Sequence, residues 1–309
     1  MNKKLAFYII KRILLAFVTI VVVITVTFFA MQLIPGGPFT SEKAVSAESL
    51  ERLKAKYGLN KPLIVQYFYY LKSALVFDFG YSIKSRGAVT VTSIIFGGMR
   101  TSAVIGLIAA LLAIIFGVVL GSLAAYKHNT PIDRAIMVLS TASVAVPSFI
   151  VATLFLYLFC MVWKVLPANG SSWLGYILPT VTLSFSPMAY IIRLTRSSTL
   201  DVLGSDYIRT ANAKGCSFSR VLFKHSLRNS LTPVITYAGP MIAFIITGSL
   251  VVEQIFGIQG IGREFVSSIT NRDYPLIMGL TIFLTYLVII MVLISDILYK
   301  VVNPRVELE

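Results

Sequence analysis

The sequence predicts an all-α, polytopic membrane protein with six transmembrane helices, and three observations lead to this fold class. The chain of 309 residues is 57% hydrophobic and 13% charged, with a mean hydropathy of +0.83, which excludes an ordinary soluble protein. Six stretches lack Asp, Glu, Lys and Arg, and a helix needs roughly 20 such residues to cross a ~30 Å hydrocarbon core. Apolar and polar residues do not alternate within them, which excludes barrel strands. The uncharged stretches are 13–31, 101–126, 135–163, 165–192, 229–252 and 274–295.

The first span is expected at 9–34 and is expected to be retained. Its uncharged stretch of 19 residues is longer than the ~7–15 apolar residues of a signal peptide. The residues Pro-Gly-Gly-Pro at 35–38 follow it, where a signal peptide would have a cleavage site with small residues. A long outer loop is then expected at 35–99.

The second span, at 100–126, carries small residues spaced four apart, at Ala109, Ala113, Gly117, Gly121 and Ala125. At 3.6 residues per turn this spacing forms a nearly straight stripe, which lets another helix approach closely. We therefore predict a helix-packing face. Because Ala and Gly are common in membrane helices, a stripe that arose by chance is the alternative.

The third and fourth spans are expected at 133–163 and 175–197. Pro147 and Pro187 lie inside them, and each proline frees a carbonyl and is expected to bend its helix. The fifth and sixth spans are expected at 230–252 and 275–299, and the whole chain, 1–309, is expected to form a single domain. Asp296, near the end of the sixth span, is either paired with Lys300 or a proton-relay site.

The distribution of basic residues predicts the orientation. With both termini in the cytoplasm, fifteen lysines and arginines fall in the terminal segments and short loops on that side. The outer segment 36–98 holds eight more, but loops of that length translocate largely regardless of charge. The net charge of +14 is therefore explained by the orientation of the chain in the lipid bilayer. Nucleic-acid binding is not expected, because the sequence shows no basic face with aromatic residues among its charges.

The predicted cytoplasmic loop 198–229 contains signals for a short helix. Ser205 is a good N-cap, Asp206 follows in the first turn, and Lys214 and Gly215 mark the end, which predicts a helix of about nine residues. A second helix is expected at 220–229, capped by Ser217 or Ser219. The alternative is an interfacial linker whose basic residues contact lipid head groups.

This loop also carries a family resemblance. The segment DYIRTANAKGCSFSRVLFKHSLRNSLTPVI resembles the cytoplasmic EAA loop of ABC-importer permeases, in the variant of the peptide-transporter branch. The positions that match the general pattern are Ala211, Gly215 and Leu227. The positions that depart from it, as the peptide branch also does, are Arg209, Thr210, His225 and Arg228.

The resemblance covers nearly the whole chain, through stretches such as YIIKRILLAF, KYGLNKPLIVQYFYYLK, SLVVEQIFGIQGIG and NRDYPL. The chain is identified as a member of the oligopeptide/dipeptide ABC-importer permeases. It is closest to the oligopeptide permease subunit of the B type, since LIPGGPFTSE and a long outer loop follow the first span.

The resemblance implies a type I ABC-importer permease fold in a bacterial or archaeal plasma membrane. It implies a homologous second permease subunit, two cytoplasmic ABC ATPase subunits, and an extracytoplasmic peptide-binding protein that delivers oligopeptides. It further implies that the short helix couples the chain to the ATPase. The coupling residues are Asp206, Tyr207, Arg209, Thr210, Ala211, Asn212, Ala213, Lys214 and Gly215.

The sequence predicts no catalysis on this chain. It has no G-x-x-x-x-G-K-[ST] motif, so ATP and Mg are expected to bind to the partner ATPase subunits. His128 and His225 lie in separate loops without nearby ligands, and metal binding is not expected. Cys160 and Cys216 are not expected to form a disulfide.

Two other classes of membrane protein predict different sequence patterns. A secondary transporter or channel would be expected to show inverted repeats and charged groups at the membrane midplane, and a membrane-embedded enzyme would need a catalytic constellation; neither pattern is visible. Substrate-contact residues cannot be named from the sequence. The charged residues before the sixth span either receive the binding protein or brace the outer loop; they are Glu253, Arg263, Glu264, Arg272 and Asp273.

Overall fold

The computed structural model describes residues 3–33, 61–85, 88–170, 172–216, 221 and 226–302. Regular structure in these ranges is helical, apart from one isolated bridge between Tyr81 and Thr90. Among the described residues, five helices are long and apolar enough to cross a membrane, or six if one bent pair counts as a span. A helix satisfies its own backbone hydrogen bonds, as lipid requires. The predicted all-α membrane architecture is confirmed.

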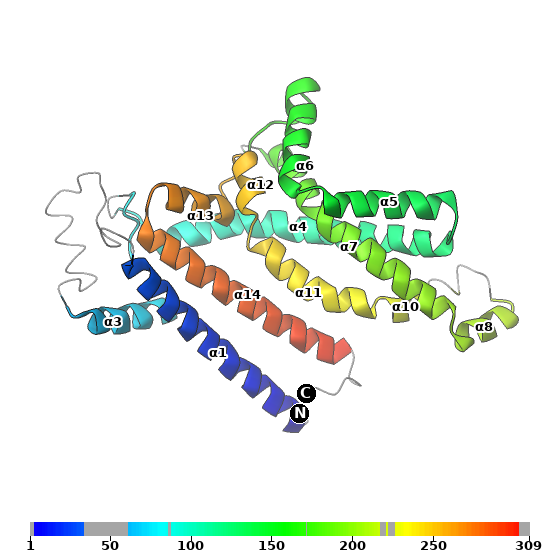
Figure 1. Ribbon diagram of the computed structural model, residues 1–309, viewed down its shortest axis with the longest axis horizontal. Helices are drawn as coiled ribbons and strands as arrows, with labels where there is room; N and C mark the ends of the chain where they lie inside the picture. The colour runs from blue at the N-terminus through cyan, green and yellow to red at the C-terminus, as the bar shows by residue number, and fades with distance from the viewer. Residues whose placement is uncertain are drawn as a thin grey trace. The chain divides into compact units, whose positions relative to one another are not determined.

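The chain divides into two compact units, and each is described by itself. The helices of the first unit are α1 (Lys3–Gln32), α3 (Leu63–Leu75), the start of α4 (Val91–Tyr126), α13 (Ile261–Thr270) and most of α14 (Tyr274–Val302) (Figure 1). Its core includes Phe79, Ile95 and Leu280, all of them fully buried. A hydrophobic cluster of this kind ties the start of α4 to α14.

Helix α3 lies in the segment that the sequence analysis assigned to a loop. It packs against the end of α1, where the hydroxyls of Thr25 and Tyr67 are 2.8 Å apart. Phe28 of α1 contacts the rings of Tyr67 and Tyr70. The remaining surface of α1 exposes mainly apolar side chains, as expected for a helix against lipid.

The second unit surrounds α7 (Ile177–Leu203), which packs against α5, α6 and α11. Its other elements are the rest of α4, α5 (Pro131–Ala145), α6 (Ser148–Phe155), the π-helix η1 (Leu156–Val162), the 3-10 helix η2 (Trp173–Tyr176), α8 (Asp206–Ala213), α10 (Leu227–Ser230), α11 (Thr232–Ile246) and α12 (Leu250–Ile255). One core cluster of this unit joins α4, α7 and α11 through Ala113, Ile191 and Met241.

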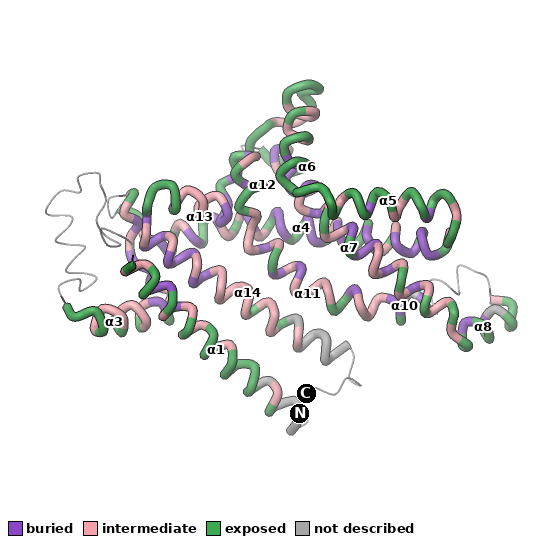
Figure 2. The backbone as a smooth tube through the Cα atoms, viewed as in Figure 1, coloured by how far each residue is buried: buried purple, intermediate pink, exposed green. Residues whose placement is uncertain are grey.

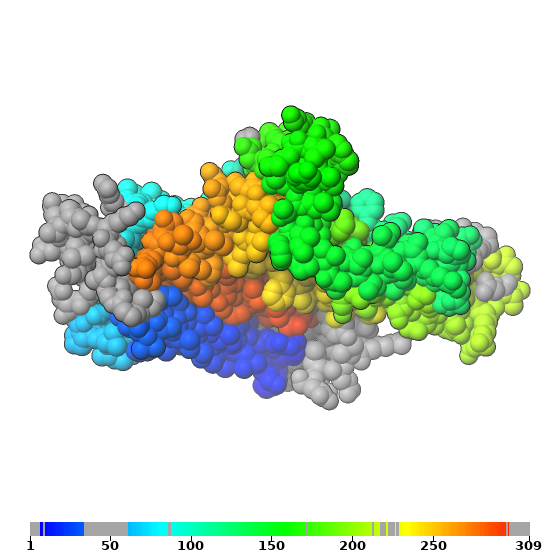
Figure 3. Space-filling view, turned by 45° about the horizontal axis from the view of Figure 1, so that its top comes forward, coloured from blue at the N-terminus to red at the C-terminus, as the bar shows by residue number. Residues whose placement is uncertain are grey.

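The expected third span, 133–163, is not one continuous helix. The axes of Pro131–Ala145 and Ser148–Val162 meet at 101°, and the break falls at Val146 and Pro147. Pro147 has no backbone N–H and cannot continue the ladder of α5, so the bend lies where the proline predicts it. The bend separates α5 from α6, and both helices lie at the surface in Figure 3.

The other predicted spans correspond to helices, but the ends of several of these helices differ from the predicted bounds. Helix α4 begins at Val91, inside the predicted outer loop, and α7 extends to Leu203. Pro187 lies within the continuous α7. Helix α11 ends at Ile246, because Gly248 adopts a φ of +80° and the chain turns into α12.

Candidate functional site: helix α8 and the helices that hold it

Helix α8 is the short helix that the sequence analysis expected after the fourth span. The carbonyl oxygen of Ser205 accepts the N–H groups of Ile208 and Arg209, both at 3.2 Å, and this places Ser205 at the N-cap position. Its hydroxyl, however, donates to the carbonyl of Val202 at 2.6 Å. The predicted N-cap position of Ser205 is confirmed by these backbone hydrogen bonds, and its hydroxyl in addition joins α8 to the last turn of α7.

The end of α8 has the geometry of a Schellman motif. The N–H of Cys216 donates to the carbonyl of Ala211 at 3.2 Å, and Gly215 between them has a φ of +73°. A β-carbon added at Gly215 would have no atom within 4 Å, so glycine is favoured there by the backbone and not by lack of space.

One side of α8 is fixed to the protein and the other is exposed. Ile208 and Ala211 are buried against Val202 and Leu203 at the end of α7. Ala211, one of the nine predicted coupling residues, therefore faces inward. The predicted coupling residues that are exposed are Asp206, Tyr207, Arg209, Thr210, Ala213, Lys214 and Gly215; the side chain of Asn212 lies outside the described residues.

Two polar contacts involve side chains on the outer side of α8. Tyr207 accepts a hydrogen bond from the side-chain amide of Asn229 at 2.9 Å, which connects α8 to α10. Arg209 and Asp206 form an ion pair of 3.6 Å along the helix, with both side chains in solvent. An exposed pair of this kind contributes little to stability, so its charges remain available to a partner. The predicted helix 220–229 falls mostly outside the described residues.

Helix α7 connects α8 to the rest of the second unit, and the small residues of α4 lie against it. All five members of the predicted stripe are buried. A β-carbon at Gly117 would lie 2.6 Å from Cγ2 of Ile191, and one at Gly121 would lie 2.6 Å from the carbonyl oxygen of Ile192. Only a residue without a β-carbon permits this approach.

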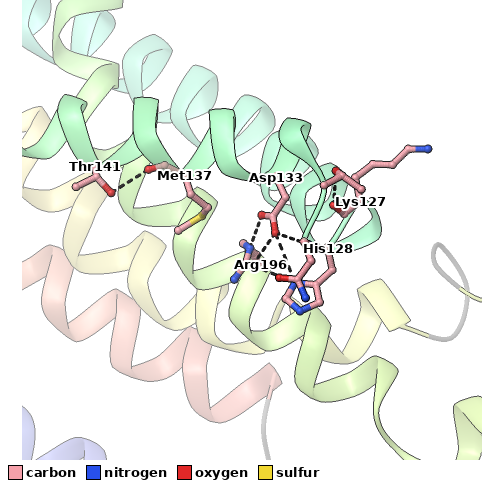
Figure 4. Close-up of polar contacts among 8 residues, drawn as sticks. Lys127, His128, Asp133, Met137, Thr141 and Arg196 are labelled. Carbon is pink, nitrogen blue, oxygen red and sulfur yellow. Dashed lines mark hydrogen bonds and ion pairs between the residues drawn. The ribbon is translucent and has the colours of Figure 1, made fainter.

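A buried ion pair joins α5 to α7 (Figure 4). Arg196 donates to Asp133 through two nitrogens, at 2.6 and 2.8 Å, and the backbone N–H of Asn129 donates to the same carboxylate at 3.0 Å. Nδ1 of His128 lies 3.1 Å from the guanidinium. Asp133 is only 3% exposed and the Arg196 side chain is 21% exposed, so the carboxylate is desolvated and the guanidinium is partly so. This cluster fixes the loop before α5 to the helix that leads into α8.

Sequence reasoning missed this cluster. Arg196 is one of the fifteen basic residues that predict the orientation, and His128 has no potential partner nearby in the sequence. The two ends of the ion pair are 63 residues apart in the chain, and no local pattern indicates that they meet. The one available signal was Asp133 itself, an acidic residue two positions after Pro131 at the start of a predicted span.

Asp273 braces a loop, which was one of the two roles weighed for the charged residues before the sixth span. It is 1% exposed, and its carboxylate accepts the hydroxyl of Ser82 and the N–H groups of Ile83 and Lys84. It also accepts the N–H of Leu276 in the first turn of α14 at 3.4 Å. Glu253 is likewise 1% exposed, so neither carboxylate lies on a surface open to a partner protein.

Nothing in the described ranges indicates catalytic or metal chemistry. No group of three His, Cys, Asp or Glu residues there has an arrangement that could hold a metal ion. His225, and the side chain of Lys300 that was expected to pair with Asp296, lie outside the described residues.

Comparison with known proteins identifies the family. The model of the family described as "Binding-protein-dependent transport system inner membrane component" matches residues 117–308, and the model of the corresponding N-terminal region matches residues 5–114. The chain is 45% identical over 305 residues to the dipeptide transport system permease protein DppB of Bacillus subtilis, covering 98% of this chain and 99% of the relative.

Relatives with an oligopeptide name are nearly as similar. The oligopeptide transport system permease proteins OppB of Salmonella typhimurium and Escherichia coli K12 are 43% and 42% identical, over 97% of this chain and 99% of theirs. A solved structure of the MetNI methionine ABC transporter is 14% identical, with a TM-score of 0.56, and covers 68% of this chain and 96% of that chain. The shared fold is that of an ABC-importer permease. The chain therefore belongs to the family of binding-protein-dependent transport system inner membrane components, as a multi-pass plasma-membrane permease related to the dipeptide and oligopeptide permeases.

Proposed function

We propose that this chain is one permease subunit of an ATP-driven importer of oligopeptides. It forms half of the pathway, and a homologous permease forms the other half. An extracytoplasmic binding protein delivers the peptide, and two cytoplasmic ATPase subunits drive its passage. The similarity to peptide permeases over nearly the whole chain supports this assignment.

The observation that carries the mechanism is the construction of α8. Its inner side is packed on the end of α7, while its outer side presents charged and polar groups to solvent. A force applied to α8 is therefore transmitted to α7, and through Gly117 and Gly121 to α4. This is what a coupling helix between an ATPase and the spans requires.

The exposed charges of α8 can help it to recognise the correct ATPase subunit. Arg209 and Lys214 add positive charge to a helix that begins with Asp206, and complementary charges on a partner affect orientation and specificity more than affinity. The predicted orientation places both termini and α8 in the cytoplasm, on the side where the partner subunits bind ATP and Mg.

Oligopeptides are proposed over dipeptides because of the sequence that follows the first span. Relatives with dipeptide and oligopeptide names have 45% and 43% identity, which does not distinguish the two substrates. Substrate length therefore has to be measured directly.

The test is transport by the complete complex. The chain is reconstituted in proteoliposomes with its partner permease, both ATPase subunits and the binding protein, and uptake of a labelled dipeptide and a labelled pentapeptide is compared. We expect uptake that favours the pentapeptide, requires ATP and the binding protein, and is lost when the P-loop lysine of the ATPase subunits is replaced. Uptake that needs no ATP and follows a proton gradient would instead support a secondary transporter.

A further inference from the structure

One face of α7 is polar and exposed although the helix is long and apolar enough to span a membrane. The residues of this face are Ser186, Tyr190, Arg193, Ser197 and Asp201, separated by four, three, four and four residues. At 3.6 residues per turn this spacing places them on one side of the helix, and we call them the α7 stripe. Arg193 is partly buried and the other four are exposed.

The remaining faces of α7 are packed within the second unit. The helix meets Gly117 and Gly121 of α4 through Ile191 and Ile192, and the hydroxyl of Ser140 in α5 donates to the carbonyl of Ala189 at 2.9 Å. On another side the hydroxyl of Ser198 donates to the carbonyl of Ser230 at 2.7 Å, next to α11. These contacts leave the α7 stripe uncovered, except that Tyr190 packs against Tyr237 of α11.

The exposed surface of α1 has a different composition. Along α1 the exposed side chains between Ile13 and Val26 are almost entirely apolar, including Leu14, Phe17, Val18 and Val22, which are about half exposed. Such a surface matches lipid. A face with two hydroxyls, a phenol and two charges does not, because polar and ionised groups in hydrocarbon are costly and usually face a water-filled cavity or a partner.

The two arginines of this part of α7 differ in their contacts. Arg196 is held by Asp133 through two hydrogen bonds. Arg193 instead lies over the ring of Tyr190, with its central carbon 5.9 Å from the ring centre. The ring of Tyr190 packs at a tilt against Tyr237 of α11, with the ring centres 4.3 Å apart. Its Nε atom is buried and has no hydrogen-bond acceptor among the described residues. The aromatic rings thus hold Arg193 in place. Among the described residues, no carboxylate lies at ion-pair distance from its guanidinium.

We propose that the α7 stripe lines the aqueous pathway of the permease, and that Arg193 receives the C-terminal carboxylate of the passing peptide. This inference rests on the proposed function, since it names the wall of the proposed pathway. A guanidinium binds a carboxylate through paired hydrogen bonds, and every linear peptide carries that group whatever its side chains are. One fixed cation therefore suits a pathway that accepts varied sequences.

The depth of the stripe separates this proposal from simple contact with lipid head groups. At 1.5 Å per residue, Arg193 lies about 6 Å and Ser186 about 16 Å along α7 from residue 197, where the fourth span is predicted to end. A snorkelling arginine reaches only the interface, whereas Ser186 is too deep in the helix for its exposure to be explained in that way.

The first experiment measures access of water to the stripe. Ser186→Cys and Ser197→Cys are made in a chain whose native thiols are removed by Cys160→Ala and Cys216→Ser, and the assembled complex is treated with a charged methanethiosulfonate. We expect both thiols to react, and saturating pentapeptide to slow the reaction. The control is Val22→Cys on α1, a site that is 52% exposed but apolar and is expected to stay unreactive.

The second experiment tests the charge of Arg193. Ser197 lies one turn from it, so the arginine should speed reaction of Ser197→Cys with an anionic reagent and slow reaction with a cationic one. We expect Arg193→Ala to lower the ratio of the two rates about fivefold, and Arg193→Lys to preserve most of it. In transport, Arg193→Ala should reduce uptake of a free-carboxylate peptide but not of its C-terminal amide, which lacks the negative charge.

The outcomes distinguish this proposal from the proposed function. Unreactive thiols at both stripe positions would show that lipid or the partner permease covers the face, and would overturn the inference even if peptide transport is normal. Reactive thiols with equal losses for the free acid and the amide would exclude Arg193 as the carboxylate site. Failure of the wild-type complex to transport any peptide would refute the proposed function, while the labelling would still report whether the stripe is in water.

Discussion

Gly215 shows how one backbone angle shapes the candidate site. Its φ of +73° allows the N–H of Cys216 to reach the carbonyl of Ala211 and closes the end of α8. A residue with a β-carbon pays roughly 1–2 kcal/mol for this conformation, although Asn tolerates it better than most. The exposed end of the helix therefore depends on the identity of this residue.

We expect Gly215→Val to insert normally but to lower peptide-stimulated ATP hydrolysis by the reconstituted complex, because the end of α8 relaxes and displaces its outer surface. Gly215→Asn is the matched control and should retain most of the coupling. If the Val variant assembles and couples like the wild type, the docking role of α8 is excluded.

The ion pair between Asp133 and Arg196 supports a second prediction at this scale. Removing Asp133 leaves the partly buried guanidinium of Arg196 without its partner, which costs at most the about 3–5 kcal/mol of a fully buried pair, whereas replacing both by apolar residues is often nearly neutral. Asp133→Leu should therefore lower the melting temperature of the protein in detergent, and the double variant Asp133→Leu, Arg196→Met should recover most of the loss. Equal melting temperatures for the single variant and the wild type would show that the pair does not fix α5 to α7.

At the scale of the elements, the contact between α4 and α7 depends on the small residues of α4. The stripe on α4 has no hydrophobic driving force to bring it to α7 in lipid, so close contact between the backbones supplies the attraction. Figure 2 shows buried positions recurring along α4 and α7.

Replacing Gly117 or Gly121 by Leu should separate α4 from α7, since even a β-carbon would lie 2.6 Å from atoms of α7. We expect a lower melting temperature in detergent and poorer recovery of the assembled complex. Gly97 provides the control, because it lies in the same helix, is exposed, and has no atom within 4 Å of its added β-carbon. Loss of stability in Gly97→Leu equal to that in Gly117→Leu would attribute the effect to glycine content and not to packing.

At the scale of the whole molecule, the predicted orientation can be tested by labelling the two cysteines. Cys216 follows the end of α8 and is partly exposed, whereas Cys160 packs in η1 beside a buried hydrophobic cluster. A membrane-impermeant maleimide added to intact cells should label neither. In inside-out vesicles without ATPase subunits it should label Cys216, and restoring those subunits should slow the labelling.

Two results would contradict that expectation in different ways. Labelling of Cys216 from outside the cell would reverse the topology and place α8 on the wrong side for ATP-driven coupling. Labelling from inside that added ATPase does not slow would leave the orientation intact but argue against close docking at the end of α8.

The sequence alone predicted the features whose causes are local. Hydropathy and the absence of charge located the spans, because crossing lipid imposes a composition on about 20 consecutive residues. The break near Pro147 and the end of α8 at Gly215 were also predictable, since a proline ring and a left-handed angle act within a few residues of themselves.

Helix α3 and the first turns of α4 were not predicted, because their stability depends on contacts with distant parts of the chain. The amphipathic pattern of α3 is stabilised by its contact with α1, and the first turns of α4 are stabilised by the core around Phe79, so neither has a strong signal in its own segment. Ser205 occupies the expected N-cap position, but the hydrogen bond from its hydroxyl to Val202 depends on how α7 ends and could not be predicted from the local sequence.

By itself, then, the sequence determined that this protein is a helical membrane permease with a short polar helix after its fourth span. Tertiary structure alone decided which side of α8 is buried, that Arg196 rather than Arg193 is neutralised by Asp133, and that Asp273 holds the loop at Ser82. These contacts join residues far apart in the chain. Their free energy depends on desolvation and on geometry created by packing, and no local pattern of residues records either.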